Sequence, residues 1–161
     1  MSANHPYKLY LFDDKLVCKL MEGKVVWDVA IGALILIAEY TNNEGPMCDD
    51  YFLVFWCVEH GKLFKMECSF YAVDAIATME TLLKRLNAST TLGLASSTEW
   101  KSNILWPPKL AEKPYFEKIE VSPSTLKARV LKASFGPSFE FPPTLEVQTY
   151  LRGFISPSTN Q

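Results

Sequence analysis

Positive charge is missing from a long central part of the chain, because no Lys or Arg stands between Lys24 and Lys62. Over all 161 residues, 16 basic side chains are set against 18 acidic ones, and the net charge is −2. General nucleic-acid binding is not expected, since it needs a positive surface. Long hydrophobic runs are missing too. The longest, residues 30–38, is far shorter than the roughly 20 residues that span a bilayer, so we expect no membrane span.

Motifs for catalysis and cofactor binding are also missing. With 7 glycines, the chain has no Gly-rich phosphate loop, and it has no Gly-x-Ser-x-Gly sequence around a nucleophile. The two histidines, His5 and His60, stand near a terminus and in a predicted turn. Cysteine and histidine lack the spacing of a zinc site. The sequence therefore predicts no catalytic residue and no cofactor.

The four cysteines, Cys18, Cys48, Cys57 and Cys68, show no CxxC spacing. Three of them fall in predicted strands opposite apolar residues, which is typical of reduced cysteines in a core. The N-terminal sequence MSANHP has neither the basic flank nor the apolar segment of a signal peptide. Together these features predict a cytoplasmic protein without disulfides.

A β-hairpin is predicted for residues 51–70. Strands at 51–58 and 62–70 flank His60-Gly61, a dipeptide that suits a two-residue turn because Gly61 can adopt a positive φ. The register places apolar pairs on one face and mixed pairs on the other: Leu53–Cys68, Phe55–Met66 and Cys57–Phe64, then Val54–Glu67 and Trp56–Lys65. The first strand is thus apolar on both faces. Its second face, with Phe52, Val54 and Trp56, needs a cover, for which we favour the C-terminal half over a second subunit or a ligand.

Four further strands and a helix are predicted in the N-terminal half. The strands are expected at residues 7–12, 15–21, 24–30 and 34–41. A turn at Glu22-Gly23 would pair six apolar residues on one face, as Leu20–Val25, Cys18–Trp27 and Leu16–Val29. The helix, residues 75–86, begins after a cap at Asp74 and ends at Asn87. We expect one core to contain Leu53, Phe55, Met66, Cys68, Met79 and Leu83.

The C-terminal half carries weaker patterns. Residues 88–97 predict a connection, and any helix that begins near Ser97 must stop before Pro107. Residues 115–121 suit a strand, and residues 122–130 suit either a helix or a strand. A short helix is expected at 144–152, and a frayed tail at 156–161.

These elements predict a single α+β domain over residues 1–161. We expect an antiparallel, strongly bent sheet or partly open barrel of about six strands, with an amphipathic helix. Residues 88–155 are expected to be an integral C-terminal extension packed on this core.

The order of elements in residues 7–87 resembles a known family. The resemblance is carried by Gly-Lys-Val-Val-Trp at 23–27, Tyr-Phe-Leu-Val-Phe at 51–55, the His60-Gly61 turn and the helix at 75–86. In these features the segment resembles a pleckstrin-homology-like domain of the GRAM or bacterial type. Lipid-binding members of that family carry basic residues in the loop between the first two strands. Here that loop is Asp13-Asp14, which argues against phosphoinositide binding.

Oxygen ligands are concentrated between residues 39 and 50. Glu39, Glu44, Asp49 and Asp50 are of the type that binds Ca²⁺ or Mg²⁺. The loop lacks the spacing of an EF-hand, and acidic loops are more often simply solvated. We therefore predict no metal site and keep these four residues as reserve candidates.

Large aromatic residues are the remaining candidates for a ligand-binding surface or an interface. Phe52, Trp56, Trp100 and Trp106 suit that role because aromatic side chains contribute much binding energy, although core packing is their more common role. The leading hypothesis is a non-enzymatic binding or protein-interaction module, expected to be a homodimer. The alternative is a small-ligand or divalent-metal-dependent enzyme that uses the acidic loop 39–50.

Overall fold

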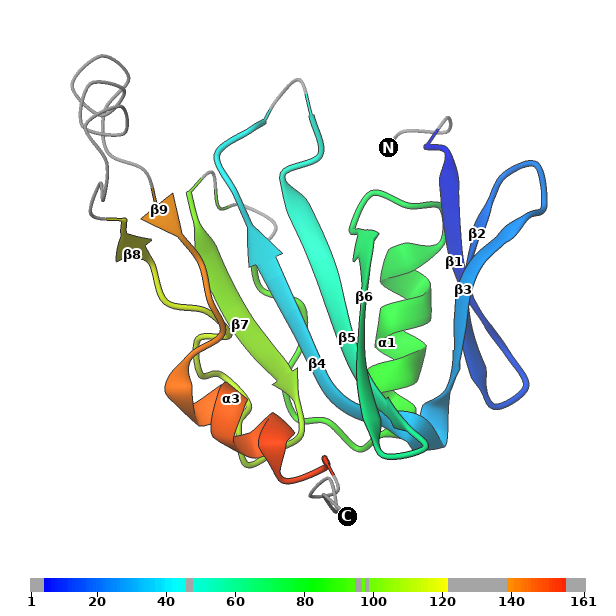
Figure 1. The fold of residues 1–161 in the computed structure, drawn as a ribbon. Coiled ribbons are helices and arrows are strands. Elements are labelled where there is room, and N and C mark those ends of the chain that lie inside the picture. The colour runs from blue at the N-terminus through cyan, green and yellow to red at the C-terminus, as the bar shows by residue number, and fades with distance from the viewer. Residues whose placement is uncertain (1–4, 46–47, 95–96, 98, 122–138, 156–161) are drawn as a thin grey trace.

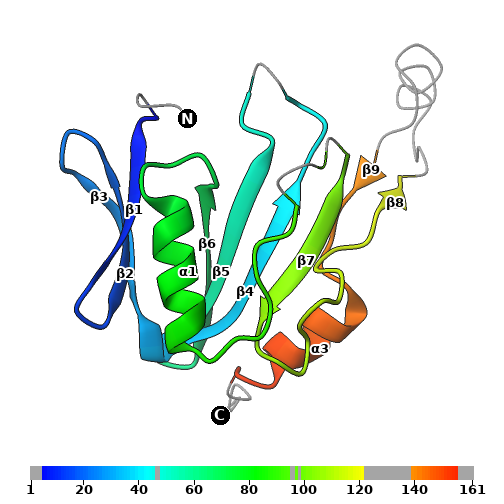
Figure 2. The same ribbon diagram turned by 180° about the vertical axis from the view of Figure 1, so that it is seen from behind.

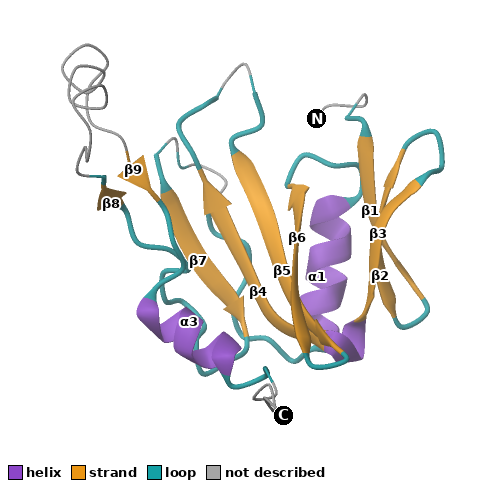
Figure 3. Ribbon diagram, viewed as in Figure 1, coloured by secondary structure: helices purple, strands orange, loops and turns teal. Residues whose placement is uncertain are grey.

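The structure is a computed structural model that describes residues 5–45, 48–94, 97, 99–121 and 139–155. Within these residues it contains two α-helices and mostly antiparallel sheets, which confirms the α+β class. A three-stranded and a four-stranded sheet stand side by side, with helix α1 (Ala75–Arg85) between them (Figure 1, Figure 3). The expected bent sheet or partly open barrel is wrong, because the six strands expected in the N-terminal half divide between these two sheets, which do not close into a barrel.

The three-stranded sheet contains β1 (Tyr7–Phe12), β2 (Lys15–Leu20) and β3 (Val25–Ala30) in that order. The predicted pairs Cys18–Trp27 and Leu16–Val29 are confirmed. The predicted pair Leu20–Val25 is wrong, because the register shifts after Cys18 and Val25 lies opposite Lys19. Such a bulge places two residues of one strand opposite one of the other, and strict alternation along the chain does not reveal it.

The four-stranded sheet has the order β6-β5-β4-β7. It contains β4 (Leu34–Thr41), β5 (Tyr51–Glu59), β6 (Lys62–Ser69) and β7 (Lys101–Trp106), and the short 3₁₀ helix η1 (Ile31–Ala33) leads from β3 into β4. The predicted register of the β5–β6 hairpin is confirmed at every pair. His60 and Gly61 have φ values of 49° and 72°, as a two-residue hairpin turn requires.

Strand β7 corrects the expectation for residues that follow Ser97. Residues 101–106 do not begin a helix but pair with β4 as an antiparallel strand. Ile104 belongs to the hydrophobic cluster on one face of the sheet, and Leu105 belongs to the cluster on the other face. Its two consecutive buried residues thus face opposite sides of the sheet, and the polar residues before them, Lys101, Ser102 and Asn103, give no alternation that would mark a strand in the sequence.

One face of the four-stranded sheet, the α1 face, carries Leu53, Phe55 and Cys57. Figure 2 shows α1 on this face, which is turned away from the viewer in Figure 1. Met79 and Leu83 of α1 belong to the same buried cluster as these strand residues, and the predicted core is confirmed. Cys68 is a member of the cluster, and Met66 packs against it.

The two ends of α1 differ in how well the sequence predicts them. Asp74 stands at the N-terminal cap position, but its φ is 62° and its side chain makes no capping hydrogen bond. Its carboxylate instead lies 2.8 Å from the Lys8 ammonium group, so the predicted capping role is wrong. At the other end Asn87 has a φ of 51°, the left-handed conformation that terminates a helix, as predicted.

The opposite face, the α3 face, carries Val54 and Trp56 and is covered by the C-terminal half. Helix α3 (Leu145–Arg152) contributes Val147 and Leu151 to the cluster on this face. The Thr144 hydroxyl caps α3 by accepting a hydrogen bond from the Val147 N–H, as expected for a helix that begins there. Three residues that follow β7 complete this cover: Leu110, Tyr115 and Phe116. The cover that we favoured for this face is thus supplied by the chain itself.

Two short strands, β8 (Ile119–Glu120) and β9 (Phe139–Glu140), pair with each other beyond this cover. β8 falls within the strand expected at residues 115–121. The alternatives for residues 122–130 and the tail at 156–161 lie outside the described residues. Within the part of the chain that the structure describes, no helix is long and apolar enough to cross a membrane.

Candidate functional site

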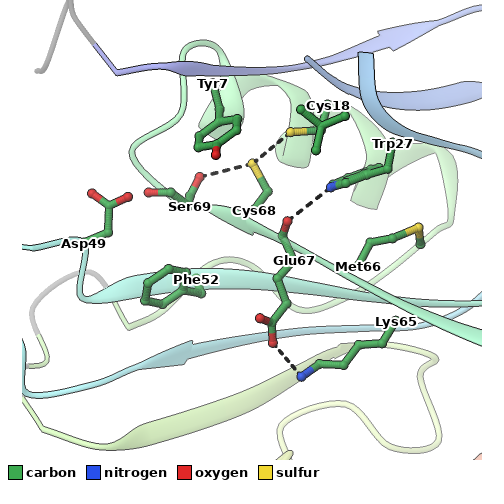
Figure 4. A pocket seen from close by; sticks show the side chains of 11 residues that line it. Tyr7, Cys18, Trp27, Asp49, Phe52, Lys65, Met66, Glu67, Cys68 and Ser69 are labelled. Atoms are coloured by element: carbon green, nitrogen blue, oxygen red, sulfur yellow. Dashed lines mark hydrogen bonds and ion pairs between the residues drawn. The ribbon is translucent and has the colours of Figure 1, made fainter. Parts of the chain in front are cut away.

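A cleft of about 380 Å³ opens between β3 and β6, and we call it the edge cleft (Figure 4). Its volume lies within the range of pockets that hold a small molecule or a large side chain. β6 contributes residues 65–69, and β3 contributes Val26 and Trp27. The remaining lining residues come from three other parts of the chain: Tyr7, Cys18, Asp49 and Phe52.

The position of this cleft follows from how the sheet edges are covered. At the outer edge of β1, the Leu9 N–H donates to the Val73 carbonyl at 3.0 Å. At the outer edge of β7, the Ile104 N–H donates to the Lys113 carbonyl at 2.9 Å. The other two edges, β3 and β6, have no partner strand within the described residues. Residues of both strands line the edge cleft.

The outer edge of β6 presents backbone hydrogen-bonding groups to the cleft. The Phe70 N–H donates to the Tyr51 carbonyl of β5 at 2.9 Å. The backbone N–H and C=O groups of every second residue before Phe70 therefore also face β5, and those of the residues between them face outward. The Glu67 carbonyl is one of the outward groups, since it accepts a hydrogen bond from Trp27 Nε1 at 3.2 Å. By the same alternation, the backbone N–H and C=O of Lys65 point into the cleft.

Apolar side chains line the cleft and charges lie on its rim. The Trp27 ring packs against Phe55 with the ring centroids 5.5 Å apart. Figure 4 shows Trp27 and Met66 on one side of the cleft and Phe52 on the other. On the rim, Lys65 Nζ lies 2.6 Å from a carboxylate oxygen of Glu67. This combination suits an apolar group carried on a polar chain.

The carboxylates of the acidic loop are directed to separate partners. Asp49 Oδ2 lies 2.9 Å from His5 Nε2. Asp50 accepts a hydrogen bond from the Tyr71 hydroxyl at 2.6 Å, and this bond together with partial burial raises the pKa of Tyr71 to about 12. Glu44 is exposed. The loop therefore does not direct these carboxylates toward one another.

Glu39 is a fully buried carboxylate on β4. It accepts hydrogen bonds from the Tyr51 hydroxyl, from the Gly93 N–H at 3.0 Å and from Asn103 Nδ2 at 3.2 Å. Burial and this hydrogen bond raise the pKa of Tyr51. Among the described residues, no group of three or more Asp, Glu, His or Cys side chains is placed to hold a metal ion. The reserve metal candidates, Glu39, Glu44, Asp49 and Asp50, thus form no site there.

The aromatic residues singled out from the sequence are distributed over different places. Phe52 lines the edge cleft. Trp56 lies on the α3 face, where its Nε1 donates to the Tyr115 hydroxyl at 3.0 Å. Trp100 stacks on the ring of Phe141 with the ring centroids 3.7 Å apart. Trp106 packs against the cluster on the α1 face. The structure does not bring these four residues together into one surface.

Sequence reasoning missed three residues of the edge cleft, Trp27, Cys18 and Cys68. Alternation along each strand assigns them to apolar positions, and this indicates burial alone. The sulfur atoms of Cys18 and Cys68 are 3.9 Å apart although 50 residues separate them in the chain. Nothing in the local sequence indicates that β2 and β6 meet.

No protein-family model, curated protein or solved structure matches this chain. The resemblance of residues 7–87 to pleckstrin-homology-like domains therefore stays a prediction.

Proposed function

We propose that the chain is a non-enzymatic binding module that takes an extended segment of a partner protein into the edge cleft, where the segment pairs with the free edge of β6. In this mode of recognition the backbone of the ligand forms ladder hydrogen bonds, and pockets beside the ladder select its side chains.

The distribution of covered and open sheet edges carries the proposal. Unpaired strand edges invite another strand, and proteins usually cover them. Here the chain covers β1 with Val73 and β7 with Lys113. The two edges that have no partner strand in the described residues line the same cleft. An added strand at β6 would lie in the gap that separates the two sheets.

The side chains around this edge fit an extended ligand. The outward backbone groups of Lys65 are available for ladder hydrogen bonds, and the apolar wall formed by Trp27 and Met66 suits one apolar side chain of the ligand. The Lys65–Glu67 pair on the rim suits a polar residue next to it in the ligand. A strand alternates its side chains in this way.

The arrangement of the acidic loop favours a binding module over the enzyme alternative. A metal-dependent reaction on residues 39–50 needs several carboxylates directed to one point. In the structure Asp49 is bound to His5, Asp50 to Tyr71, and Glu39 is enclosed by its three donors.

A single backbone change tests the proposal. Lys65→Pro removes the outward N–H of residue 65 and leaves the hydrogen bonds of β6 to β5 in place, and proline is tolerated at such edge positions. The matched control Lys65→Ala removes the same side chain and keeps the N–H. Peptides selected from a random twelve-residue phage library on the wild-type chain should bind Lys65→Ala within about threefold and lose at least tenfold in affinity for Lys65→Pro, which corresponds to more than about 1.4 kcal/mol.

A second measurement guards against misfolding of the proline variant. On the wild-type chain, peptide binding should shift the amide NMR signals of Lys65 and Glu67 more than those of Phe64 and Met66, whose N–H groups face β5. Equal binding to both variants, or shifts confined to another surface, would contradict the proposal. Sedimentation of the wild-type chain distinguishes a special case, in which β6 pairs with β6 of a second copy. The dimer would then form in wild type and be lost in Lys65→Pro.

A further inference from the structure

Two cysteines from different sheets meet in the edge cleft. Cys18 lies on β2 and Cys68 lies on β6, and their sulfur atoms are 3.9 Å apart within hydrogen-bonding contact (Figure 4). Both side chains are buried, with 2% and 5% of their surface exposed, and both line the cleft. The two cysteines thus stand in the wall of the cleft, and the cleft is the side from which a peroxide would reach them.

The distance between the two sulfur atoms is suited to bond formation. A disulfide has an S–S length of about 2.05 Å, so the two sulfur atoms must approach each other by about 2 Å for the bond to form. The other cysteines are placed differently. Cys57 is buried on β5, and Cys48 is exposed in the loop that precedes β5.

The pair also has an order of reactivity. The hydrogen bond with Cys68 lowers the pKa of the Cys18 thiol, and the same hydrogen bond together with burial raises the pKa of Cys68. The hydrogen bond thus favours a thiolate at Cys18 over one at Cys68, and the thiolate is the nucleophilic form of cysteine. The pKa of Cys57 is raised by burial, which makes that thiol less reactive.

We propose that Cys18 and Cys68 form a redox-active dithiol that a hydroperoxide oxidises to an intramolecular disulfide. In the first step the Cys18 thiolate attacks one peroxide oxygen, the O–O bond breaks, and Cys18 becomes a sulfenic acid while hydroxide leaves. In the second step the Cys68 thiol attacks the Cys18 sulfur, the S–O bond breaks and water leaves. In sum, two thiols and one hydrogen peroxide give one disulfide and two waters, and two electrons pass from sulfur to peroxide.

The disulfide would join β2 of one sheet to β6 of the other beside the edge cleft. It would close a loop of 50 residues and hold the cleft at one width. The reaction concerns the chain's own thiols, so it does not rest on the peptide-binding function proposed above.

The test uses the double variant Cys48→Ser, Cys57→Ala, which retains only Cys18 and Cys68. After brief treatment with a small molar excess of hydrogen peroxide, thiol titration of the denatured protein should fall from both thiols to neither. The intact mass should fall by about 2 Da because two hydrogens are lost, and dithiothreitol should restore both readings. A peptide map of the oxidised wild-type chain should contain Cys18 linked to Cys68, which keeps the test valid if the double variant folds poorly.

Removal of either thiol separates the two roles. With Cys68→Ser added, the Cys18 sulfenic acid should persist and be trapped by dimedone. With Cys18→Ser added instead, the remaining Cys68 should react at least tenfold more slowly. Free Cys18 and Cys68 thiols after peroxide treatment of the wild-type chain, sulfinic acids at both positions, or disulfides only between molecules would overturn the proposal.

Discussion

The two faces of the four-stranded sheet are both buried, but they are covered by different kinds of structure. On the α1 face, the cover is a regular helix and a second sheet, and the contacts are mostly aliphatic and sulfur-containing. On the α3 face, the cover is the short helix α3 together with irregular segments rich in aromatic residues. Trp56 and Tyr115 meet there through a hydrogen bond as well as through packing.

The covers of the two faces also differ in how far they depend on contacts between distant residues. The irregular segment after β7 is held by hydrogen bonds to side chains, since the N–H groups of Tyr115 and Phe116 both donate to the Ser102 hydroxyl at 3.0 and 3.1 Å. Helix α3 is held in part by the Tyr150 hydroxyl, which donates to the Ile35 carbonyl at 2.9 Å. The α1 face is thus covered by elements with strong local patterns, and the α3 face by elements that need the sheet to hold them in place.

Removal of the whole α3-face cover should have the largest effect. A chain truncated after Asn87 keeps α1, the three-stranded sheet and strands β4, β5 and β6, but it loses β7 and exposes Val54, Trp56 and the rest of the α3 face. We expect an insoluble or aggregating product that binds hydrophobic dyes, because a contiguous apolar face of this kind does not stay in water. Dye fluorescence and light scattering measure this outcome. A soluble fragment that unfolds cooperatively would instead make residues 7–87 an independent module, and the C-terminal segment would not be integral.

Neighbouring residues on β5 compare the two faces at one point in the sheet. Phe55→Ala on the α1 face should cost about 3–5 kcal/mol of unfolding free energy, because Phe55 is fully buried and its loss leaves a cavity. Val54→Ala on the α3 face removes two methyl groups and should cost roughly 2 kcal/mol. Urea unfolding of both variants measures the two values. A cost below about 1 kcal/mol for Phe55→Ala would contradict the packing of the α1 face described above.

The buried carboxylate at one end of the α1 face offers the smallest of these tests. Glu39→Gln keeps the shape of the side chain but places an amide N–H₂ where the carboxylate accepts hydrogen bonds from Gly93 and Asn103. We expect a loss of about 1–3 kcal/mol, the usual cost of unsatisfied buried polar groups. The control Tyr51→Phe removes one donor and leaves the carboxylate. If Glu39→Gln is neutral in urea unfolding, this hydrogen-bond network does not stabilise the fold.

The patterns that predicted the fold correctly are short-range ones. The β5–β6 register follows from alternation and from a two-residue turn at His60-Gly61. Helix α1 follows from the spacing of residues such as Met79 and Leu83, and α3 from the cap at Thr144. Each of these signals is contained within about twenty residues of chain, so no tertiary information is needed to read it.

The features that only the folded chain determines depend on contacts between distant residues. The bulge that pairs Val25 with Lys19 depends on how β2 and β3 pack, and the strand at β7 depends on its pairing with β4. The local sequence does not show either feature. The edge cleft is lined by β3 and β6, whose outer edges have no partner strand within the described residues, and only the folded chain brings these two strands to one cleft. The meeting of Cys18 with Cys68 has the same origin. Alternation assigns each residue to a face of its own strand, but only the packing of one sheet against the other decides which residues meet across the gap.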